Sequence, residues 1–152
     1  MIVKATLSDA KQLTEIALKS KAIWGYSNEL IESWREDLTV IPKMFEDFNI
    51  YKYLVNNEIA GFYILHRANI RTSFLEFLFV SPSFIKKGIG KQLLDHAIEY
   101  CIGGSSAILN VLSDPNAESF YAKHGFKVIG RRESSVEGRL LPEMELEFPE
   151  NM

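Results

Sequence analysis

The amino-acid sequence predicts a single α+β domain built on a largely antiparallel β-sheet. The middle of the chain reads as three consecutive strands joined by short turns, and amphipathic helical segments precede and follow them. No internal repeat, low-complexity segment or linker interrupts the 152 residues. This length is sufficient for one sizeable core, and the 47% hydrophobic fraction is typical of a globular protein. We therefore expect residues 1–152 to form one domain.

Composition also restricts the functional class. The net charge of −3 argues against general nucleic-acid binding, which usually needs a basic face. No apolar run approaches the roughly 20 residues that a membrane helix needs, and the first residues lack a signal-peptide layout. The single cysteine, Cys101, fits a reducing cytosol and lies in an apolar helical stripe, where we expect it to be core. We expect a cytoplasmic protein with no membrane or nucleic-acid partner.

The first part of the chain reads as one strand and three helices. Residues 2–6 form a short strand, and Ser8 is expected to cap the helix that follows. Gly25 ends that helix, and a second one is predicted over residues 28–38. Pro42 suits the first turn of a short helix over residues 42–47.

The antiparallel meander follows, and further strands alternate with two helices. In the meander, Asn56 and Asn57 form a tight turn, because asparagine tolerates the left-handed conformation. Gly103 stops the first helix after the meander, and Gly125 stops the second, which Asp114 caps. The predicted strands are residues 50–55, 58–66, 74–80, 107–112, 126–132 and 143–148, and the two helices are residues 92–102 and 115–124.

The stretch VSPSFIKKGIGK, residues 80–91, joins a strand to a helix through a glycine-containing loop. Gly88 and Gly90 remove side chains where the backbone enters the helix, which leaves N–H groups free to meet a phosphate. By itself the signal is weak, since Leu93 stands where a dinucleotide fingerprint has its third glycine and no Walker pattern is present. A loop of this kind is more often only a turn.

Three segments together carry a family resemblance. They are LEFLFVSPSFIKKGIGKQLL from Leu75, SDPNAESFYAKHGF from Ser113 and VEGRLLPEME from Val136. In order and spacing they resemble the GNAT acyltransferase superfamily along nearly the whole chain. The resemblance implies a GNAT-like fold, with a twisted, mostly antiparallel sheet of about six or seven strands flanked by about four helices.

The resemblance implies an N-acetyltransferase that moves an acetyl group from acetyl-CoA to a primary amine. The acceptor amine is a small molecule or part of a protein, and attack is direct within a ternary complex, since no placed nucleophile is evident for a covalent route. A homodimer is possible. Two positions depart from the family pattern: Ile85 stands where Gln or Arg is usual, and Asp114 where Asn is usual. The CoA-contacting asparagine is therefore assigned to Asn116.

The resemblance assigns Tyr121 as the acid that protonates the leaving thiolate; the alternative is an ordinary core tyrosine. Glu76 is the candidate base, because a carboxylate buried in an apolar strand would have a raised pKa. The alternatives are a solvent-facing or structurally paired glutamate and proton relay by bulk water. Either way the amine must lose its proton before attack, since its pKa is about 10.4 in a lysine.

The implied cofactor contacts fall into three groups. Backbone groups of one strand end would pair with the pantetheine arm, as an added strand pairs with a sheet edge. The glycine loop would hold the pyrophosphate, and the Tyr-containing helix would complete the site. The residues so assigned are Leu78, Phe79, Val80, Ile85, Lys86, Lys87, Gly88, Ile89, Gly90, Lys91, Asn116, Phe120 and Tyr121.

Trp24 and Tyr26 flank a glycine where the family shapes its acceptor site, and packing is their alternative role. Arg139 could contact an acceptor or a partner chain. The histidines show no metal-ligand spacing, so no metal is predicted. Two rival functions stay open: a non-catalytic acyl-CoA-binding module that senses the cofactor or regulates a partner, and a dinucleotide-binding oxidoreductase. The second is disfavoured because such domains need βαβ units rather than a meander.

Overall fold

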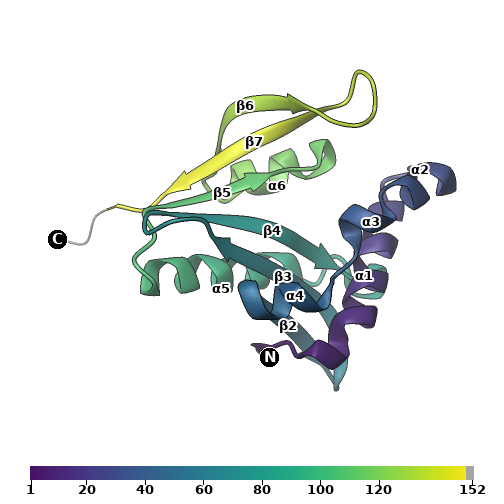
Figure 1. The fold of residues 1–152 in the computed structure, drawn as a ribbon, viewed down its shortest axis with the longest axis horizontal. Coiled ribbons are helices and arrows are strands. Elements are labelled where there is room, and N and C mark those ends of the chain that lie inside the picture. Colours follow the sequence, from purple (N-terminus) through teal and green to yellow (C-terminus); the bar gives the residue numbers. More distant parts are fainter. Residues whose placement is uncertain (150–152) are drawn as a thin grey trace. The chain divides into compact units, whose positions relative to one another are not determined.

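The computed structural model describes residues 1–149 (Figure 1). Seven strands are hydrogen-bonded in the order β1-β2-β3-β4-β5-β7-β6. The chain divides into two compact units. The first comprises Met1–Leu65 and Phe77–Ala97, and the second comprises His66–Glu76 and the residues from Ile98 onward. That the whole chain works as one domain stays a prediction.

The first unit holds the N-terminal helices and the first two strands of the meander. Its elements are β1 (Ile2–Lys4), a 3₁₀ turn η1 (Leu7–Asp9), α1 (Ala10–Ala22), α2 (Asn28–Ser33), α3 (Arg35–Leu38), α4 (Pro42–Asp47), β2 (Asn49–Val55) and most of β3 (Glu58–Arg67). It also contains the end of β4 (Thr72–Val80), a 3₁₀ turn η2 (Pro82–Phe84) and the start of α5 (Ile89–Gly103).

Local sequence accounts for these elements, with two corrections. The backbone N–H of Thr6 donates to the Asp9 carboxylate over 2.9 Å, so Thr6 and Asp9, rather than Ser8, form the polar start of the first helical turn. The helix predicted over residues 28–38 is interrupted at Trp34, whose backbone (φ −96°, ψ 0°) lies between α2 and α3. The helix over Pro42–Asp47 is confirmed.

The meander follows the predicted pattern. β2 and β3 are antiparallel, and Asn56 and Asn57 between them have φ values of 50° and 65°, as the predicted tight turn requires. Ala60 to Leu65 of β3 are all buried, so β3 is covered on both faces. Gly61 permits a close approach, because a Cβ atom there would lie 2.8 Å from the Phe79 carbonyl oxygen. The core of this unit therefore sits around the centre of β3.

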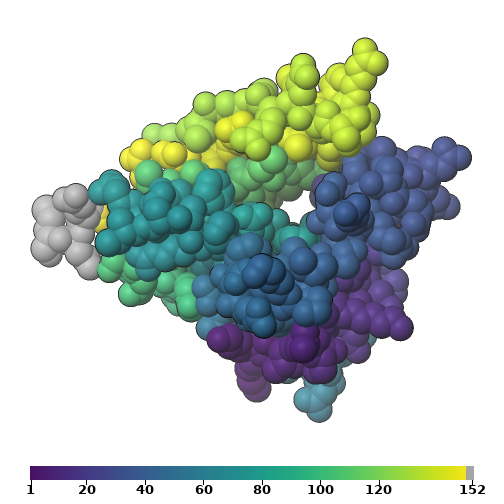
Figure 2. Space-filling model, viewed as in Figure 1, coloured from purple at the N-terminus to yellow at the C-terminus, as the bar shows by residue number. Residues whose placement is uncertain are grey.

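The second unit carries the C-terminal part of the sheet. β4 pairs in parallel with β5 (Ile108–Leu112), and β7 (Leu140–Glu147) lies antiparallel between β5 and β6 (Lys127–Glu133). A 3₁₀ turn η3 (Pro115–Ala117) and α6 (Glu118–Lys123) connect β5 to β6. The hairpin of β6 and β7 is visible in Figure 1, and its connecting loop protrudes in the space-filling view (Figure 2).

Two predicted boundaries shift here. β7 starts at Leu140, three residues before the predicted strand, because residues 140–142 pair with β6 and shorten the polar loop. α5 starts at Ile89, before the predicted Gln92, so the glycine loop includes the first helical turn.

Cys101 is buried, as predicted, and Ser73 and Ser106 share a buried hydrogen bond of 2.8 Å. Within residues 1–149 no helix is long and apolar enough to cross a membrane.

Candidate functional site

The glycine loop of the first unit presents backbone donors at the start of α5. Lys86 and Gly88 both have left-handed backbones, with φ values of 64° and 74°. The first N–H that bonds back into the helix is that of Gln92, which donates to the Gly88 carbonyl over 3.1 Å. The N–H groups of the preceding first turn therefore have no partner within the helix. These donors and the helix dipole favour an anion.

The loop side chains differ from the predicted lysine cradle in one respect. Ile85, Lys86 and Lys87 are exposed, whereas Ile89 is buried and anchors the helix start. The Lys91 ammonium lies 3.0 Å from the Asp95 carboxylate, one helical turn further on. Lys91 is thus paired with an acidic neighbour, although its side chain is exposed like those of Lys86 and Lys87.

The strand end that precedes the loop is partly buried in the first unit. Leu78, Phe79 and Val80 are each of intermediate exposure. The Phe79 ring packs against Phe62 and Phe77, with ring centroids 6.0 and 5.8 Å apart. The Phe79 side chain therefore packs against other aromatic rings at the edge of the core, and backbone groups of this strand keep their predicted cofactor role.

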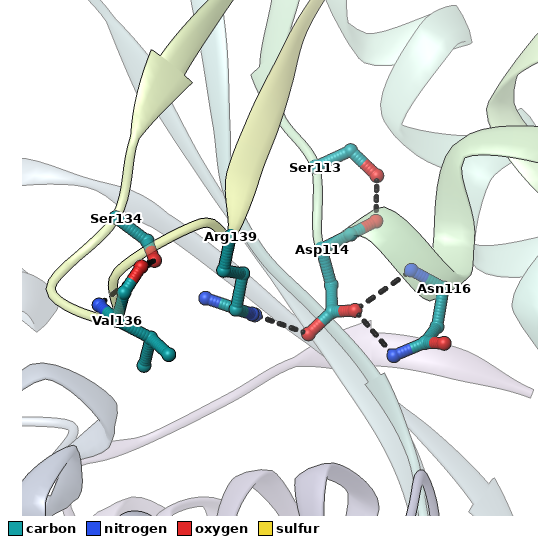
Figure 3. Close-up of polar contacts among 6 residues, drawn as sticks. All are labelled: Ser113, Asp114, Asn116, Ser134, Val136 and Arg139. Atoms are coloured by element: carbon teal, nitrogen blue, oxygen red, sulfur yellow. Dashed lines mark hydrogen bonds and ion pairs between the residues drawn. The ribbon is translucent and has the colours of Figure 1, made fainter.

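In the second unit, Asp114 organises the turn before α6 (Figure 3). One of its carboxylate oxygens accepts hydrogen bonds from the backbone and side-chain nitrogens of Asn116, over 2.8 and 2.9 Å. The other lies 2.9 Å from the Arg139 guanidinium, which reaches it from the β6–β7 loop. The Asp114 and Arg139 side chains are only 9% and 14% exposed. Arg139 therefore makes an internal ion pair that sequence reasoning did not anticipate.

Tyr121 lies on α6 and is 6% exposed. Its ring makes edge contacts with Phe120 and Phe126, with centroids 5.2 and 5.3 Å apart. Burial raises the pKa of the Tyr121 phenol well above its ordinary value, because the phenolate would lose its solvation. The phenol therefore stays protonated, as both a proton donor and a core tyrosine require.

Glu76 is not buried, which corrects the premise of its predicted role. Along β4 the side chains of Ser73, Leu75 and Phe77 are buried, whereas Glu76 is 40% exposed. Because strand side chains alternate between faces, the apolar neighbours of Glu76 in sequence do not surround it in space. Its carboxylate lies 3.4 Å from Nδ1 of His66.

Glu76 lines a pocket of about 350 Å³ within the second unit. Its walls come from β3, β4, β5, β6 and β7, and we call it the β4–β7 pocket. Its polar and aromatic lining comprises His66, Phe74, Glu76, Asn110, Arg132 and Glu143. Of these, sequence analysis had identified Glu76 alone. The available signal was the alternation of glutamates in β7, which places Glu143, Glu145 and Glu147 on one strand face.

The predicted acceptor residues Trp24 and Tyr26 lie in the first unit, on the turn between α1 and α2. Trp24 is 50% exposed, whereas Tyr26 packs edge-on against Trp34 with ring centroids 4.9 Å apart. Gly25 between them has a φ of 87°, which explains the chain reversal. Tyr26 thus has the packing contact that was its alternative, and Trp24 is the more accessible of the two.

Comparison with known protein families gives a match over most of the chain. The family described as "Acetyltransferase (GNAT) domain" matches residues 16–148. Peptidyl-lysine N-acetyltransferase YjaB of Salmonella typhimurium is 35% identical over 75 residues, which are 49% of this chain and 50% of that protein. The chain thus spans about half the length of this curated relative.

Solved structures share the fold along almost the entire chain. The PaiA N-acetyltransferase of Thermoplasma acidophilum, solved in complex with coenzyme A, is 25% identical with a TM-score of 0.81, over 97% of this chain and 98% of that one. A GCN5-related N-acetyltransferase of Rhodopseudomonas palustris has a TM-score of 0.82 at 20% identity, over 97% and 95% of the two chains. The predicted fold class is confirmed.

Proposed function

Because this chain belongs to the GNAT acetyltransferase family, whose cosubstrate is acetyl-CoA, we propose that it transfers an acetyl group from acetyl-CoA to a primary amine. The observation that carries the proposal is the left-handed Gly88 at the start of α5. A Cβ atom built on Gly88 would meet nothing within 4 Å, so the backbone there is open to a ligand. Unpaired N–H groups at such an opening suit the pyrophosphate of the cofactor.

The family resemblance assigns cofactor contacts to residues in each unit. In the first, the N–H groups from Ile85 to Lys91 would hold the phosphates, and Lys86 and Lys87 would add positive charge. The strand end over Leu78–Val80 would pair with the pantetheine arm. In the second, Asn116 and the rings of Phe120 and Tyr121 are the assigned contacts. Bound acetyl-CoA supplies the activated acetyl thioester.

Tyr121 is the proposed general acid. The amine nitrogen forms a bond to the acetyl carbon, the carbon–sulfur bond breaks, and the phenol of Tyr121 gives its proton to the departing sulfur. A thiol has a pKa of about 8.5, so this donation assists departure without being indispensable. The raised pKa keeps the phenol protonated throughout the physiological pH range, and it also makes the phenol a weaker acid toward the departing sulfur.

Glu76 is the proposed base, by the route predicted from the sequence but with an exposed rather than a buried carboxylate. Its carboxylate is accessible and lies beside His66, so a proton from the amine can pass to Glu76 directly or through water. Bulk water without a dedicated base is the competing route. A Glu76→Gln variant with unchanged turnover between pH 6 and 9 would assign the proton transfer to water.

The acceptor is a primary amine, and the match to a peptidyl-lysine N-acetyltransferase makes a lysine side chain one candidate. We also propose a cytoplasmic location, which the buried, unpaired Cys101 thiol supports. A homodimer stays a prediction that size-exclusion chromatography with light scattering would test. The non-catalytic alternative, an acyl-CoA sensor, predicts binding of acetyl-CoA without turnover.

The test of the proposed function is a thermal-shift titration with acetyl-CoA, with ATP and NAD at matched concentration. A ligand at about 100 times its Kd stabilises the folded state by roughly 2.7 kcal/mol, which for a domain of this size raises Tm by several degrees. A rise with acetyl-CoA alone, followed by thiol release with an amine, supports the proposal. A rise with NAD alone would overturn it, and binding without turnover of any amine would favour the sensor.

A further inference from the structure

The β4–β7 pocket brings together side chains from five strands, β3 to β7, and several of these side chains share one face of the sheet. Phe74 of β4 is the register partner of Asn110 on β5, and Asn110 is that of Glu145 on β7. In the next row, Leu112 of β5 is the register partner of Glu143. Glu76, two residues after Phe74, lies on the same face of β4. The face is thus defined by register rather than by proximity in sequence.

Asn110 contributes a hydrogen-bond acceptor that the protein itself does not satisfy. The side-chain oxygen of Asn110 is buried and has no hydrogen-bond partner among residues 1–149. A buried acceptor without a donor destabilises the folded state, because it has lost its hydrogen bonds to water. Because Asn110 also lines the pocket, a ligand that carries N–H donors would remove this destabilisation. A ligand that is only an acceptor would not.

Carboxylates exceed cations on this face. Four glutamates occupy it, Glu76 on β4 and Glu143, Glu145 and Glu147 on β7, because residues two apart on a strand share a face. The facing positive groups are Arg132, whose Nε lies 3.2 Å from Glu143, and Lys127, the register partner of Glu145. His66 faces Glu76 at 3.4 Å.

The excess of carboxylates affects the pKa of Glu145. The pKa of its carboxyl is raised, first because of burial and then because Glu147 lies beside it. A positive ligand would relieve this repulsion. Apolar side chains complete the pocket, since Phe74, Leu112 and Ile129 line it and offer a surface for an aliphatic chain. A volume of about 350 Å³ falls at the lower end of the range for small-molecule sites.

We propose that the β4–β7 pocket binds the acceptor and selects an aliphatic diamine, whose second ammonium group is held by the Asn110 oxygen and the surrounding glutamates. The inference rests on the proposed acetyltransferase function. The reacting nitrogen must be neutral when it attacks, so a site that favours positive charge serves the nitrogen that does not react. A monoamine of the same length leaves the Asn110 oxygen unpaired and the carboxylates uncompensated.

Three acceptors of matched length test the proposal on the full chain with saturating acetyl-CoA: 1,4-diaminobutane, n-butylamine and 4-aminobutanoate. We expect kcat/KM to be at least about tenfold higher for the diamine than for butylamine, since one bond to a charged group contributes roughly 1.5 to 3 kcal/mol. The lowest value is expected for 4-aminobutanoate, whose carboxylate the glutamates repel. A preference for 4-aminobutanoate would mean that Arg132 binds the far end of the acceptor, and it would overturn the proposal. Equal kcat/KM values for the diamine and butylamine would overturn it as well.

Asn110→Leu separates a binding role from a structural one. Removing an unsatisfied buried oxygen is expected to leave Tm unchanged or raise it, whereas KM for the diamine should rise about tenfold and the value for butylamine should stay constant. Glu145→Gln should act in the same direction, and Glu58→Gln, which removes one exposed charge from the start of β3, is the matched control. An Asn110→Leu enzyme with an unaltered KM for the diamine would contradict the assignment.

Calorimetric binding keeps failure of this inference distinct from failure of the proposed function. The diamine is titrated into the protein with CoA, so that no turnover is needed. Binding that Asn110→Leu weakens supports the pocket even if no acceptor is acetylated, in which case only the catalytic proposal falls. No binding of the diamine, or binding that Asn110→Leu leaves unchanged, overturns the pocket assignment whether or not other amines are acetylated. A lysine peptide preferred over the diamine would likewise overturn it.

Discussion

Burial gives Tyr121 a phenol that stays protonated at neutral pH but is a weaker acid than the phenol of an exposed tyrosine. Its phenol is buried among aromatic rings, and that burial keeps the pKa above the ordinary value of 10.0. Tyr121 is also part of the core of its unit. A variant at this position must therefore preserve the ring in order to report on chemistry.

Tyr121→Phe removes the hydroxyl and keeps the ring. We expect kcat to fall about tenfold or more, because a positioned acid usually contributes 10² to 10⁴ and a thiolate leaving group needs it less than an alkoxide would. Affinity for acetyl-CoA should stay close to that of the wild type, which calorimetry would measure. Unchanged kcat across a range of pH would remove Tyr121 from the mechanism and leave it as a core residue.

Two turns are shaped by single local features: the loop before α5 by the backbone conformation of Gly88, and the turn before α6 by an ion pair. In the first, Gly88 adopts a left-handed backbone at a position that is open to solvent. In the second, the buried Asp114–Arg139 pair joins the β6–β7 loop to the turn that carries Asn116 (Figure 3). Asp114 departs from the asparagine usual in the family, and the structure supplies Arg139 as its counter-charge.

Gly88→Val should abolish binding of acetyl-CoA, because a branched side chain blocks approach to the backbone donors and resists a φ of 74°. Gly25→Val is the matched control, since Gly25 has a φ of 87°, a Cβ atom there would meet nothing within 4 Å, and it lies outside the assigned cofactor residues. Both variants should lose similar stability, about 1 to 2 kcal/mol. Normal acetyl-CoA binding by Gly88→Val would contradict the assignment of the loop.

Arg139→Ala should destabilise the protein by about 3 kcal/mol, because it leaves the Asp114 carboxylate buried without its counter-charge. The corresponding fall in Tm is roughly 6 to 12 °C. Arg139→Lys keeps the charge but loses the planar fork, so it should recover part of the stability. A Tm for Arg139→Ala within about 1 °C of the wild-type value would show that the pair contributes little.

The stability of the whole molecule depends on pH through two buried groups, Cys101 and Tyr121, because burial raises the pKa of both. Burial raises the pKa of the Cys101 thiol from 9.0 to about 11 and that of the Tyr121 phenol further above 10.0. Both groups become charged when they lose a proton, and burial in the folded chain disfavours that charge. The unfolded chain therefore releases these protons at a lower pH than the folded chain. Their contribution is therefore fully present below about pH 9 and is lost as the pH rises.

We expect Tm to fall progressively from about pH 9 to pH 11, with Cys101 contributing on the order of 2 kcal/mol across this window. Thermal unfolding at pH 7, 9, 10 and 11 measures the effect. Cys101→Ala should show a shallower fall between pH 9 and 11, since the titrating thiol is gone. The same slope in the variant and the wild type would mean that the thiol ionises equally in both states.

Several elements were predictable because their causes are local. The Asn56–Asn57 turn, the helix beginning at Pro42 and the glycine loop each depend on backbone preferences of the residues that form them. The interruption at Trp34 was not predictable, because the periodic apolar positions on either side of it satisfy one continuous helix equally well. The predicted burial of Glu76 was wrong for a related reason, since its exposure depends on which face of β4 the neighbouring elements cover.

Residue types at short, regular spacings were enough to predict the family and the fold class, both of which are confirmed, and they also predict a phosphate-binding loop. Only the tertiary structure decided that Arg139 meets Asp114 and that Asn110, Glu76 and Glu143 line one pocket. These residues lie on separate strands and loops, and strand register and face, which long-range pairing sets, determine which of them meet. A linear pattern does not contain that register, so the acceptor pocket becomes visible only in the folded chain.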